Sequence, residues 1–126
     1  MKRFIFALAA IAVCVVTAFS CVRTVKTQIQ PIKTNISSAL TAFSSGQREQ
    51  GSKYVNKAIE HFEKSEKALT LFVGSEATQN LKKDLNILLK LSKQKDKALF
   101  SQKAEECLYE ITDIEEAQNL SLVNIL

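Results

Sequence analysis

The chain has 126 residues, with 17 Lys and Arg against 13 Asp and Glu, and a net charge of +4. This length leaves room for one domain, and three glycines with one proline are too few for the turns of a many-stranded sheet. The charges of both signs are interspersed instead of gathering into a basic face with aromatic residues, which argues against a nucleic-acid-binding protein. The composition therefore favours an all-α protein.

An apolar segment opens the chain. Lys2 and Arg3 are followed by nineteen residues, Phe4 to Val22, without a charged residue, a glycine or a proline. As a helix this segment measures about 28 Å, close to the roughly 30 Å of the hydrocarbon core of a bilayer. The length therefore favours a helix that spans the membrane.

Two other interpretations of this segment stay open. Ala18 and Ser20 put small side chains three and one residues before a possible cut ahead of Cys21, as in a secretory signal peptide. Cys21 is also where a lipoprotein would carry its diacylglycerol, although Phe19 is bulky where such sites have a small residue. We favour a retained span, with cleavage or lipidation at Cys21 as alternatives.

All three interpretations divide the chain in the same way. We predict a membrane anchor at residues 1–22, as a signal anchor or a signal peptide, and an extracytoplasmic helical bundle with a short apolar C-terminal tail at residues 23–126. Lys2 and Arg3 place the start of the chain in the cytoplasm, although Arg23 on the far side weakens this bias. We expect a single-pass protein of the cell membrane whose bundle faces outside, and the alternatives are a lipid-anchored or secreted bundle.

The exported part begins with a helical pattern. Apolar side chains recur at three- and four-residue steps from Ile29 to Phe43, the spacing of one helix face. Pro31 lacks a backbone donor, so we expect it to kink or restart this helix just outside the bilayer. The segment Ser44–Ser52 holds two of the three glycines and is predicted to be a loop.

A second apolar stripe extends from Tyr54 to Phe72 and predicts a helix that ends near Gly74. Glycine tolerates the left-handed backbone of a helix C-cap. Ser75 is then placed to cap a third helix, which is predicted from about Glu76 to Lys95.

The last predicted helix follows Asp96, whose side chain is placed to cap it, and carries an apolar stripe from Ala98 to Ile114. Seven lysines lie between Leu81 and Lys103, and six acids lie between Ala104 and Ala117. Attraction between these runs favours an antiparallel hairpin of the third and fourth helices. The alternative is one long helix through Asp96, which would need a partner chain.

Short connections between these helices predict an antiparallel up-down bundle of three to four helices after the transmembrane helix. The loop at Ser44–Ser52 and the turn at Asp96 then lie far from the bilayer. The end of the second helix and the apolar tail lie near it. The residues expected next to the membrane are Phe72, Leu122, Ile125 and Leu126.

Side chains that carry catalysis or bind metals are scarce. His61 is the only histidine, and Ala58 stands where the Glu-x-x-His motif of helical metal sites needs its Glu. Cys107 lies on the apolar stripe of the last helix. A cysteine in such a place usually packs in the core as a small hydrophobic side chain. We predict no catalytic residue, no metal site and no cofactor, and therefore no enzyme.

A run of lysines near the third turn offers a contact for an anionic polymer or for lipid headgroups. Its candidate residues are Lys90, Lys93 and Lys97.

Three segments of the chain carry a family resemblance. They are the apolar anchor after Lys2 and Arg3, the segment HFEKSEKALTLFV at 61–73, and the ending EEAQNLSLVNIL at 115–126. In these the chain resembles a bacterial family known as a domain of unknown function, family 4363, whose members are small membrane-anchored helical proteins of Firmicutes-type bacteria. Members often have Trp where this chain has Phe62. The resemblance implies a retained anchor and a helical body, and it carries over no catalytic residue.

Two functions fit these observations. The first is a non-enzymatic interaction or scaffold module at the cell envelope, with an envelope protein or a second copy of the chain as partner. The alternative is a lipoprotein or a secreted helical subunit that binds an anionic ligand or wall polymer. A contiguous exposed apolar patch would favour the first, and a basic groove with salt-sensitive binding would favour the second.

Overall fold

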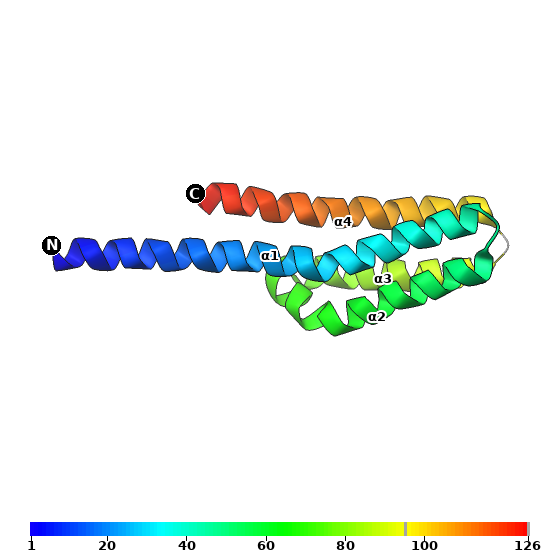
Figure 1. Cartoon of the computed structure of the whole chain (residues 1–126), viewed down its shortest axis with the longest axis horizontal. Coiled ribbons are helices and arrows are strands. Elements are labelled where there is room, and N and C mark those ends of the chain that lie inside the picture. The colour runs from blue at the N-terminus through cyan, green and yellow to red at the C-terminus, as the bar shows by residue number, and fades with distance from the viewer. Residues whose placement is uncertain (95, 126) are drawn as a thin grey trace.

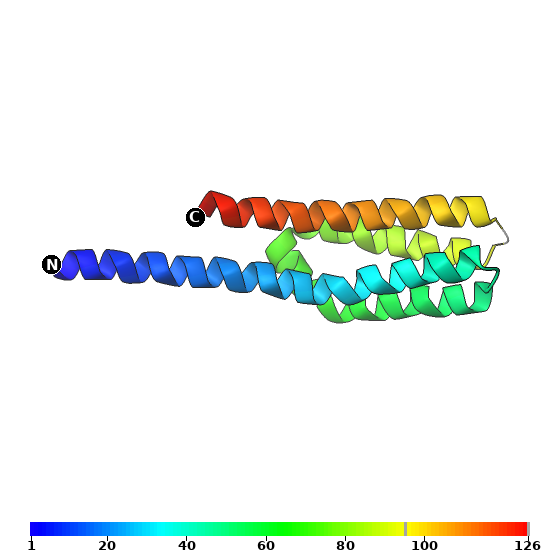
Figure 2. The same ribbon diagram turned by 45° about the horizontal axis from the view of Figure 1, so that its top comes forward.

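The computed structural model describes residues 1–94 and 96–125, with side chains described through Leu120. Its elements are the helices α1 (Lys2–Ser44), α2 (Arg48–Val73), α3 (Ser75–Ser92) and α4 (Lys97–Ile125). Successive helices run in opposite directions, and α1 and α3 each pack against both α2 and α4 (Figure 1 and Figure 2). The prediction of an all-α up-down bundle is confirmed.

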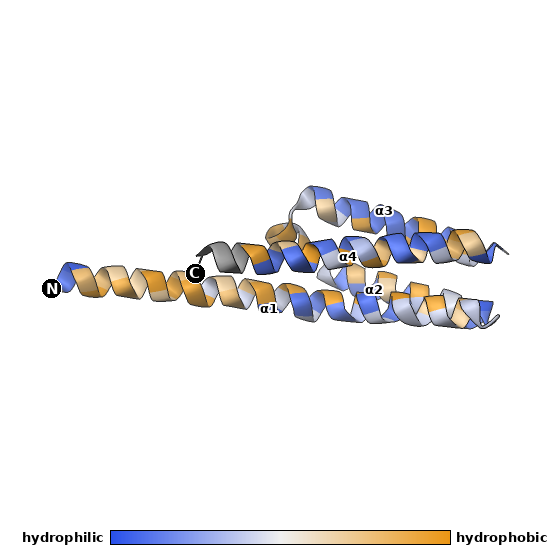
Figure 3. Cartoon of the chain, turned by 90° about the horizontal axis from the view of Figure 1, so that it is seen from above, coloured by the Kyte–Doolittle hydropathy of each residue, from blue (hydrophilic) through white to orange (hydrophobic). Residues whose placement is uncertain are grey.

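The helix α1 contains both the apolar N-terminal segment and the first helix of the bundle. Its first half projects beyond the other helices, and its second half forms one wall of the bundle (Figure 1). Residues 1–21 are exposed or half-exposed, and burial begins at Val22. Apolar colour covers most of the projecting half in Figure 3, whereas it alternates with polar colour along the bundle. Most of the apolar segment therefore packs against nothing else in the described chain.

Of the two expected effects of Pro31, a kink or a restart, the restart does not occur, because α1 continues through the proline. The proline ring removes the N–H that would bond to the carbonyl of Thr27. Ile29 and Ile32, on either side of Pro31, are fully buried and keep both halves of α1 in one packing stripe. The side-chain amide of Asn35 also donates to the Pro31 carbonyl at 2.8 Å. The helix bends midway along its length in Figure 1 and continues.

The core is one apolar cluster along the bundle axis, to which all four helices contribute. The stripe of α1 supplies Ile29, Ile32 and Ile36, which have no exposed surface. At the end of the bundle away from the N-terminus, the distal end, the rings of Phe43 and Phe100 stack with centroids 4.1 Å apart. An aromatic pair of this kind contributes about 0.5–1.5 kcal/mol beyond its burial. It joins the end of α1 to the start of α4.

The connection between α1 and α2 is shorter than the loop predicted for Ser44–Ser52. Only Ser45–Gln47 lies between the helices, and Gly51 is buried within α2. A Cβ on Gly51 would lie 3.3 Å from Cδ2 of Phe43, which is tighter than an ordinary contact. Gly51 therefore permits a close approach of two helices, and a glycine with that role does not break the helix that contains it.

Gly74 connects α2 to α3 with a φ of +111°, a backbone conformation that other residues rarely adopt. The predicted role of this glycine is therefore confirmed. Ser75 does not cap α3, because it is the first helical residue and Gly74 occupies the cap position. The hydroxyl of Thr78 donates to the Gly74 carbonyl at 2.7 Å and satisfies an acceptor at the turn.

The helices α3 and α4 are separate, so the alternative of one long helix is wrong. The helix α3 ends at Ser92, short of the predicted Lys95, and the Ser92 hydroxyl donates to the Leu89 carbonyl at 2.6 Å. Asp96 caps α4 as predicted, because its Oδ1 accepts hydrogen bonds from the N–H groups of Ala98 and Leu99 at 3.1 and 3.2 Å.

Ion pairs join the helices in a different pattern from the predicted one. Among the described residues, the ion pair between α3 and α4 joins Lys103 Nζ to Asp84 Oδ1 at 2.9 Å. The lysine lies on α4 and the acid on α3, whereas the charge runs predicted lysines on the third helix and acids on the fourth. Lys82 of α3 pairs instead with Glu66 of α2 at 3.3 Å. The hairpin is correct, but its stability comes from the apolar stripes, since an exposed ion pair contributes only about 0.2–1 kcal/mol.

The connections between the helices lie at the two ends of the bundle, as expected for an up-down order. The α1–α2 and α3–α4 connections share the distal end, and the α2–α3 connection lies at the opposite, proximal end beside the middle of α1 (Figure 1 and Figure 2). The last turns of α4 extend past this connection toward the N-terminus. The proximal end therefore surrounds the part of α1 where the apolar segment stops.

The close approach at Gly51 provides a test of the packing. Replacing Gly51 with Leu is expected to lower the free energy of unfolding by about 1–3 kcal/mol, because the larger side chain overlaps the ring of Phe43. Urea unfolding of the full chain in detergent, followed by circular dichroism, measures this. The matched control is Asn56→Leu at an exposed position of the same helix. Equal stability of the two variants would contradict the close approach.

Candidate functional site

A group of charged side chains lies between α3 and α4. It consists of Asp84 on α3 with Lys103, Glu106 and Glu110 on α4, and it is referred to below as the polar cluster. Lys103 Nζ lies 2.9 Å from Asp84 Oδ1 and 3.3 Å from Glu106 Oε2. The side chains of Asp84 and Lys103 are only 11% and 19% exposed. Spacings of three and four residues place the α4 members on one face of that helix.

The carboxyl groups of Asp84 and Glu110 share a hydrogen bond. Burial, this hydrogen bond and the charge of Asp84 raise the pKa of Glu110 from 4.5 to about 7. Burial acts to raise the pKa of Asp84 as well, but the hydrogen bonds with Glu110 and Lys103 outweigh it and lower that pKa. At slightly acidic pH the pair therefore holds one proton, which resides on Glu110 and is donated to the Asp84 carboxylate.

Lys103 and Cys107 complete the surroundings of this pair. The hydrogen bond with Asp84 raises the pKa of Lys103 despite its burial, so the lysine stays charged beside the carboxylate. Cys107 has no exposed surface, and burial raises the pKa of its thiol to about 12. A thiol with that pKa is protonated at neutral pH and is a poor nucleophile. The polar cluster thus links two helices and offers a titrating carboxyl group.

The predicted polyanion contacts lie at different places on the surface. Lys93 lines a hollow of about 1030 Å³ at the distal end, together with Arg48 and Lys53 of α2. Lys90 lines a separate hollow along α3. Lys97 is the exposed first residue of α4. The structure therefore brings Lys93 next to two cations from α2 that the sequence did not single out.

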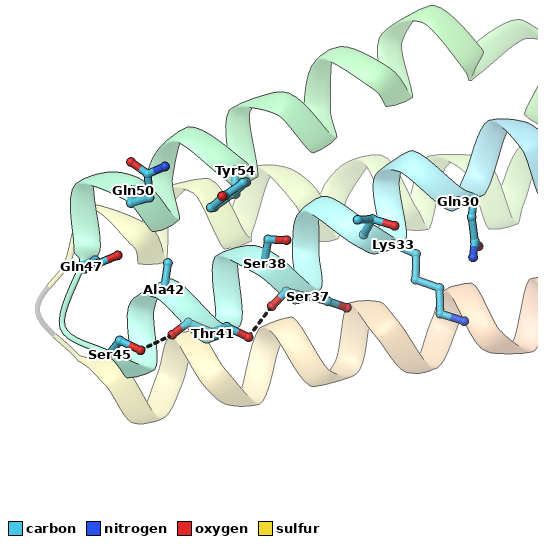
Figure 4. Close-up of a pocket in the computed structure, with 11 residues that line it drawn as sticks. Gln30, Lys33, Ser37, Ser38, Thr41, Ala42, Ser45, Gln47, Gln50 and Tyr54 are labelled. Carbon is cyan, nitrogen blue, oxygen red and sulfur yellow. Dashed lines mark hydrogen bonds between the residues drawn. The ribbon is translucent and has the colours of Figure 1, made fainter.

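A polar groove of about 660 Å³ runs along α1 and the start of α2 (Figure 4). Its lining is mostly hydroxyl and amide side chains, namely Gln30, Lys33, Thr34, Ser37, Ser38, Thr41, Ala42, Ser45, Gln47, Gln50 and Tyr54. The hydroxyls of Thr41 and Ser45 donate to backbone carbonyls one turn earlier, at 3.1 and 3.0 Å. Their oxygens still accept hydrogen bonds, so the groove suits a polar partner.

The sequence contains a signal for this groove. Small polar residues recur at three- and four-residue steps at Thr34, Ser38, Thr41 and Ser45, on the side of the helix away from the isoleucine stripe. Such residues are also typical of an ordinary solvated face. Only the neighbouring start of α2, with Tyr54, turns this face into a groove.

The remaining predicted positions are spread along the chain. Cys21 is half-buried on α1, directly before the first buried residue, and His61 is half-buried on α2. Phe72 packs against the core at the proximal end. Within residues 1–94 and 96–125, no three His, Cys, Asp or Glu side chains are grouped so that they could hold a metal ion.

Three of the predicted membrane contacts lie in or beyond the last turns of α4. Leu122 and Ile125 belong to that helix, where the structure describes only the backbone. Leu126 lies outside the described residues.

The Glu110 carboxyl gives the fold a specific dependence on pH. Its pKa is higher in the folded chain than its usual value, so the folded state holds the proton more tightly. The contribution of Glu110 to the free energy of unfolding is therefore greatest below about pH 4.5. It falls by about 1–2 kcal/mol as the pH rises through 7. The variant Glu110→Gln keeps a hydrogen-bond donor and should lose this dependence, becoming more stable than the parent chain at pH 8.

Urea unfolding at pH 5, 6.5 and 8 measures the effect, with Glu105→Gln as the control at an exposed site on the same helix. A parent chain whose stability does not fall between pH 5 and 8 would contradict the shared proton.

Comparison with protein families yields a match over most of the chain. The model of the family described as "Domain of unknown function (DUF4363)" matches residues 19–125, which include the end of the apolar segment and nearly the whole bundle. No curated protein and no solved structure is detectably similar to the chain. Since the match covers far more than half of its length, the chain belongs to the DUF4363 family.

Proposed function

We propose that this protein is a single-pass membrane protein whose helical bundle lies outside the cytoplasmic membrane and serves as a non-enzymatic interaction or scaffold module. The apolar half of α1 is its anchor. The bundle presents polar surfaces, with an envelope protein or a second copy of the chain as the partner.

The observation that carries this proposal is the continuity of α1. This helix is long and apolar enough to cross a bilayer, a property that signal sequences near an N-terminus share. Only 6% of its most apolar window is buried in the described chain. An apolar helix surface left unpacked over this length is stable in lipid and unfavourable in water. The helix also passes through Cys21 without interruption into the bundle, which favours a retained anchor over cleavage there.

The outward orientation is supported by charge. Lys2 and Arg3 precede the apolar segment, and basic residues are retained on the cytoplasmic side of a membrane. Arg23 and Lys26 follow the segment and weaken the contrast. Both are exposed, and their long side chains can reach the headgroups at the outer surface.

The interaction role is supported by the polar groove on α1 and α2. It lies on the wall of the bundle, in line with the anchor, and its hydroxyl and amide groups can form hydrogen bonds with a partner. The polar cluster contributes to the packing of the bundle, because Asp84 and Lys103 are paired with one another between two helices. Cys107 is fully buried and its thiol pKa is raised to about 12, so it is a poor nucleophile.

A second candidate is a lipid-anchored or secreted subunit that binds an anionic ligand or wall polymer. The distal hollow lined by Arg48, Lys53 and Lys93 favours it, since three cations surround one depression at the end farthest from the anchor. Glu49 in the same hollow reduces that charge. Binding to an anionic polymer that weakens steeply with added salt would distinguish this candidate.

The anchor is tested by the intact mass of the chain in membranes of expressing bacteria and by its resistance to alkaline extraction. We expect the full-length mass and retention in the membrane pellet. The variant Val13→Arg places a charge at the centre of the span, at a cost of about 2.5–3.5 kcal/mol, and should reduce retention. The matched control Leu99→Arg changes an exposed leucine of the bundle and should not.

Other masses would support the alternatives. A chain that lacks its first twenty residues and carries diacylglycerol would be a lipoprotein anchored at Cys21. The same loss without lipid would be a secreted bundle, and either result would contradict the retained anchor.

The interaction role is tested by photo-crosslinking in whole cells. A photoreactive amino acid at Thr34, in the groove, is expected to form a defined crosslinked band on a denaturing gel, because a bound partner would lie within reach of that position. The same amino acid at Asn56, exposed on α2 and outside the groove lining, is the control. Identical patterns from both positions would contradict binding in the groove.

A further inference from the structure

We propose that the proximal end of the bundle is a lipid-contact surface, formed by Leu71 of α2 and Leu120 of α4, which rests on the bilayer around the anchor. This inference depends on the proposed membrane span. If the proposal is correct, lipid covers the proximal end, and the bundle rests directly on the membrane surface.

The height of Leu120 follows from the pairing of α4 with α1. The stacked rings of Phe43 and Phe100 place these two residues at the same level of the antiparallel helices. Twenty residues separate Phe100 from Leu120, and twenty separate Phe43 from Arg23. Because both helices rise about 1.5 Å per residue, Leu120 lies close to the level of Arg23. Arg23 directly follows Val22, the last residue of the apolar segment.

The height of Leu71 follows independently from the pairing of α2 with α1. The hydroxyl of Ser65 donates to the side-chain oxygen of Gln28, so these two residues share a level. Leu71 lies six residues beyond Ser65, and Val22 lies six residues before Gln28. Leu71 therefore lies level with Val22, and two leucines from different helices reach the same plane as the end of the anchor.

These leucines are exposed in a way that the bundle does not explain. Leu71 is 76% exposed and Leu120 is 65% exposed, and among the described residues the other exposed large apolar side chains of the bundle are Leu99 and Tyr109, which lie nearer the start of α4. Their helices are joined at this end, since the side-chain amide of Gln118 donates to the Phe72 carbonyl at 3.3 Å. Figure 3 colours this end of α2 as hydrophobic. Two large apolar side chains at one end form a surface that lipid would cover.

The path of α4 points to the same partner. Its backbone continues past Leu120 to Ile125, toward the N-terminus and beyond the α2–α3 connection (Figure 1 and Figure 2). By the same pairing with α1, Ile125 lies level with about Ala18, inside the apolar segment. The sequence Leu120–Ile125 has no charged residue. An uncharged helix end at this level is compatible with the headgroup region at the edge of a bilayer, where water can bond to the last carbonyl groups of the helix.

A bilayer is favoured over a protein partner because the anchor brings it to this surface. Any membrane that contains the apolar half of α1 necessarily ends near Val22 and Arg23, and both leucines lie in that plane. Their partner is then present wherever the anchor is inserted.

The test measures how deep single side chains lie in vesicles. Each full-length variant carries one labelled cysteine. Positions 71 and 120 test the proposed surface, position 99 is the exposed distal control, and position 13 reports on the anchor. Their background is Cys14→Ala with Cys21→Ala, and the buried Cys107, with its raised thiol pKa, remains unlabelled. The variants Leu71→Cys, Leu120→Cys, Leu99→Cys and Val13→Cys are labelled with bimane. The vesicles contain phosphatidylcholine and phosphatidylglycerol with lipids brominated near the headgroup or at mid-chain.

We expect the labels at 71 and 120 to lose fluorescence to bromine near the headgroup and the label at 99 to keep it. The label at 13 should respond to mid-chain bromine. Quenching at 13 without quenching at 71 and 120 would overturn the lipid-contact surface and leave the anchor intact. No quenching at 13 would overturn the membrane span itself. A shift of the emission at 71 and 120 to shorter wavelength without quenching would mean that protein covers the surface, and this also overturns the proposal.

Discussion

The unbroken backbone of α1 is the constraint on which the rest of the structure depends. Its 43 residues form one hydrogen-bonded rod, in which the apolar half and the bundle half share a direction. The missing donor at Pro31 would weaken an isolated helix by about 3 kcal/mol, yet the buried stripe of Ile29, Ile32 and Ile36 crosses that position. Packing against α2 and α4 therefore maintains the rod where local propensity opposes it.

Two contacts at the distal end set the positions of the other helices along this rod. Gly51 allows α2 to approach the end of α1, and the stacked rings of Phe43 and Phe100 fix α4 against the same residues. Antiparallel helices with the same rise carry this alignment along their whole length. The level of the proximal end is thus determined by contacts at the opposite end of the bundle. Small changes at the distal end would move every pairing toward the anchor.

The polar cluster concentrates the pH sensitivity of the bundle at the contact of α3 with α4. Asp84 and Glu110 share one proton while Lys103 remains charged beside them, so the balance of charge between these helices changes near neutral pH. Exposed ion pairs on the surface contribute little to stability, because water screens their charges. One partly buried carboxyl pair therefore matters more to this fold than the longer charge runs on its surface.

The sequence by itself determined the helical class, the apolar stripe of each helix, the glycine at the α2–α3 turn and the Asp96 cap, because these depend on side chains close together in the chain. It also identified the family through three local segments. Only the tertiary structure decided that α1 continues through Pro31, that Gly51 packs inside a helix, and that Asp84 meets Glu110. Each of these depends on which side chain another helix brings opposite. The polar groove has the same origin, since a periodic row of Ser and Thr looks like a solvated face until α2 lies beside it.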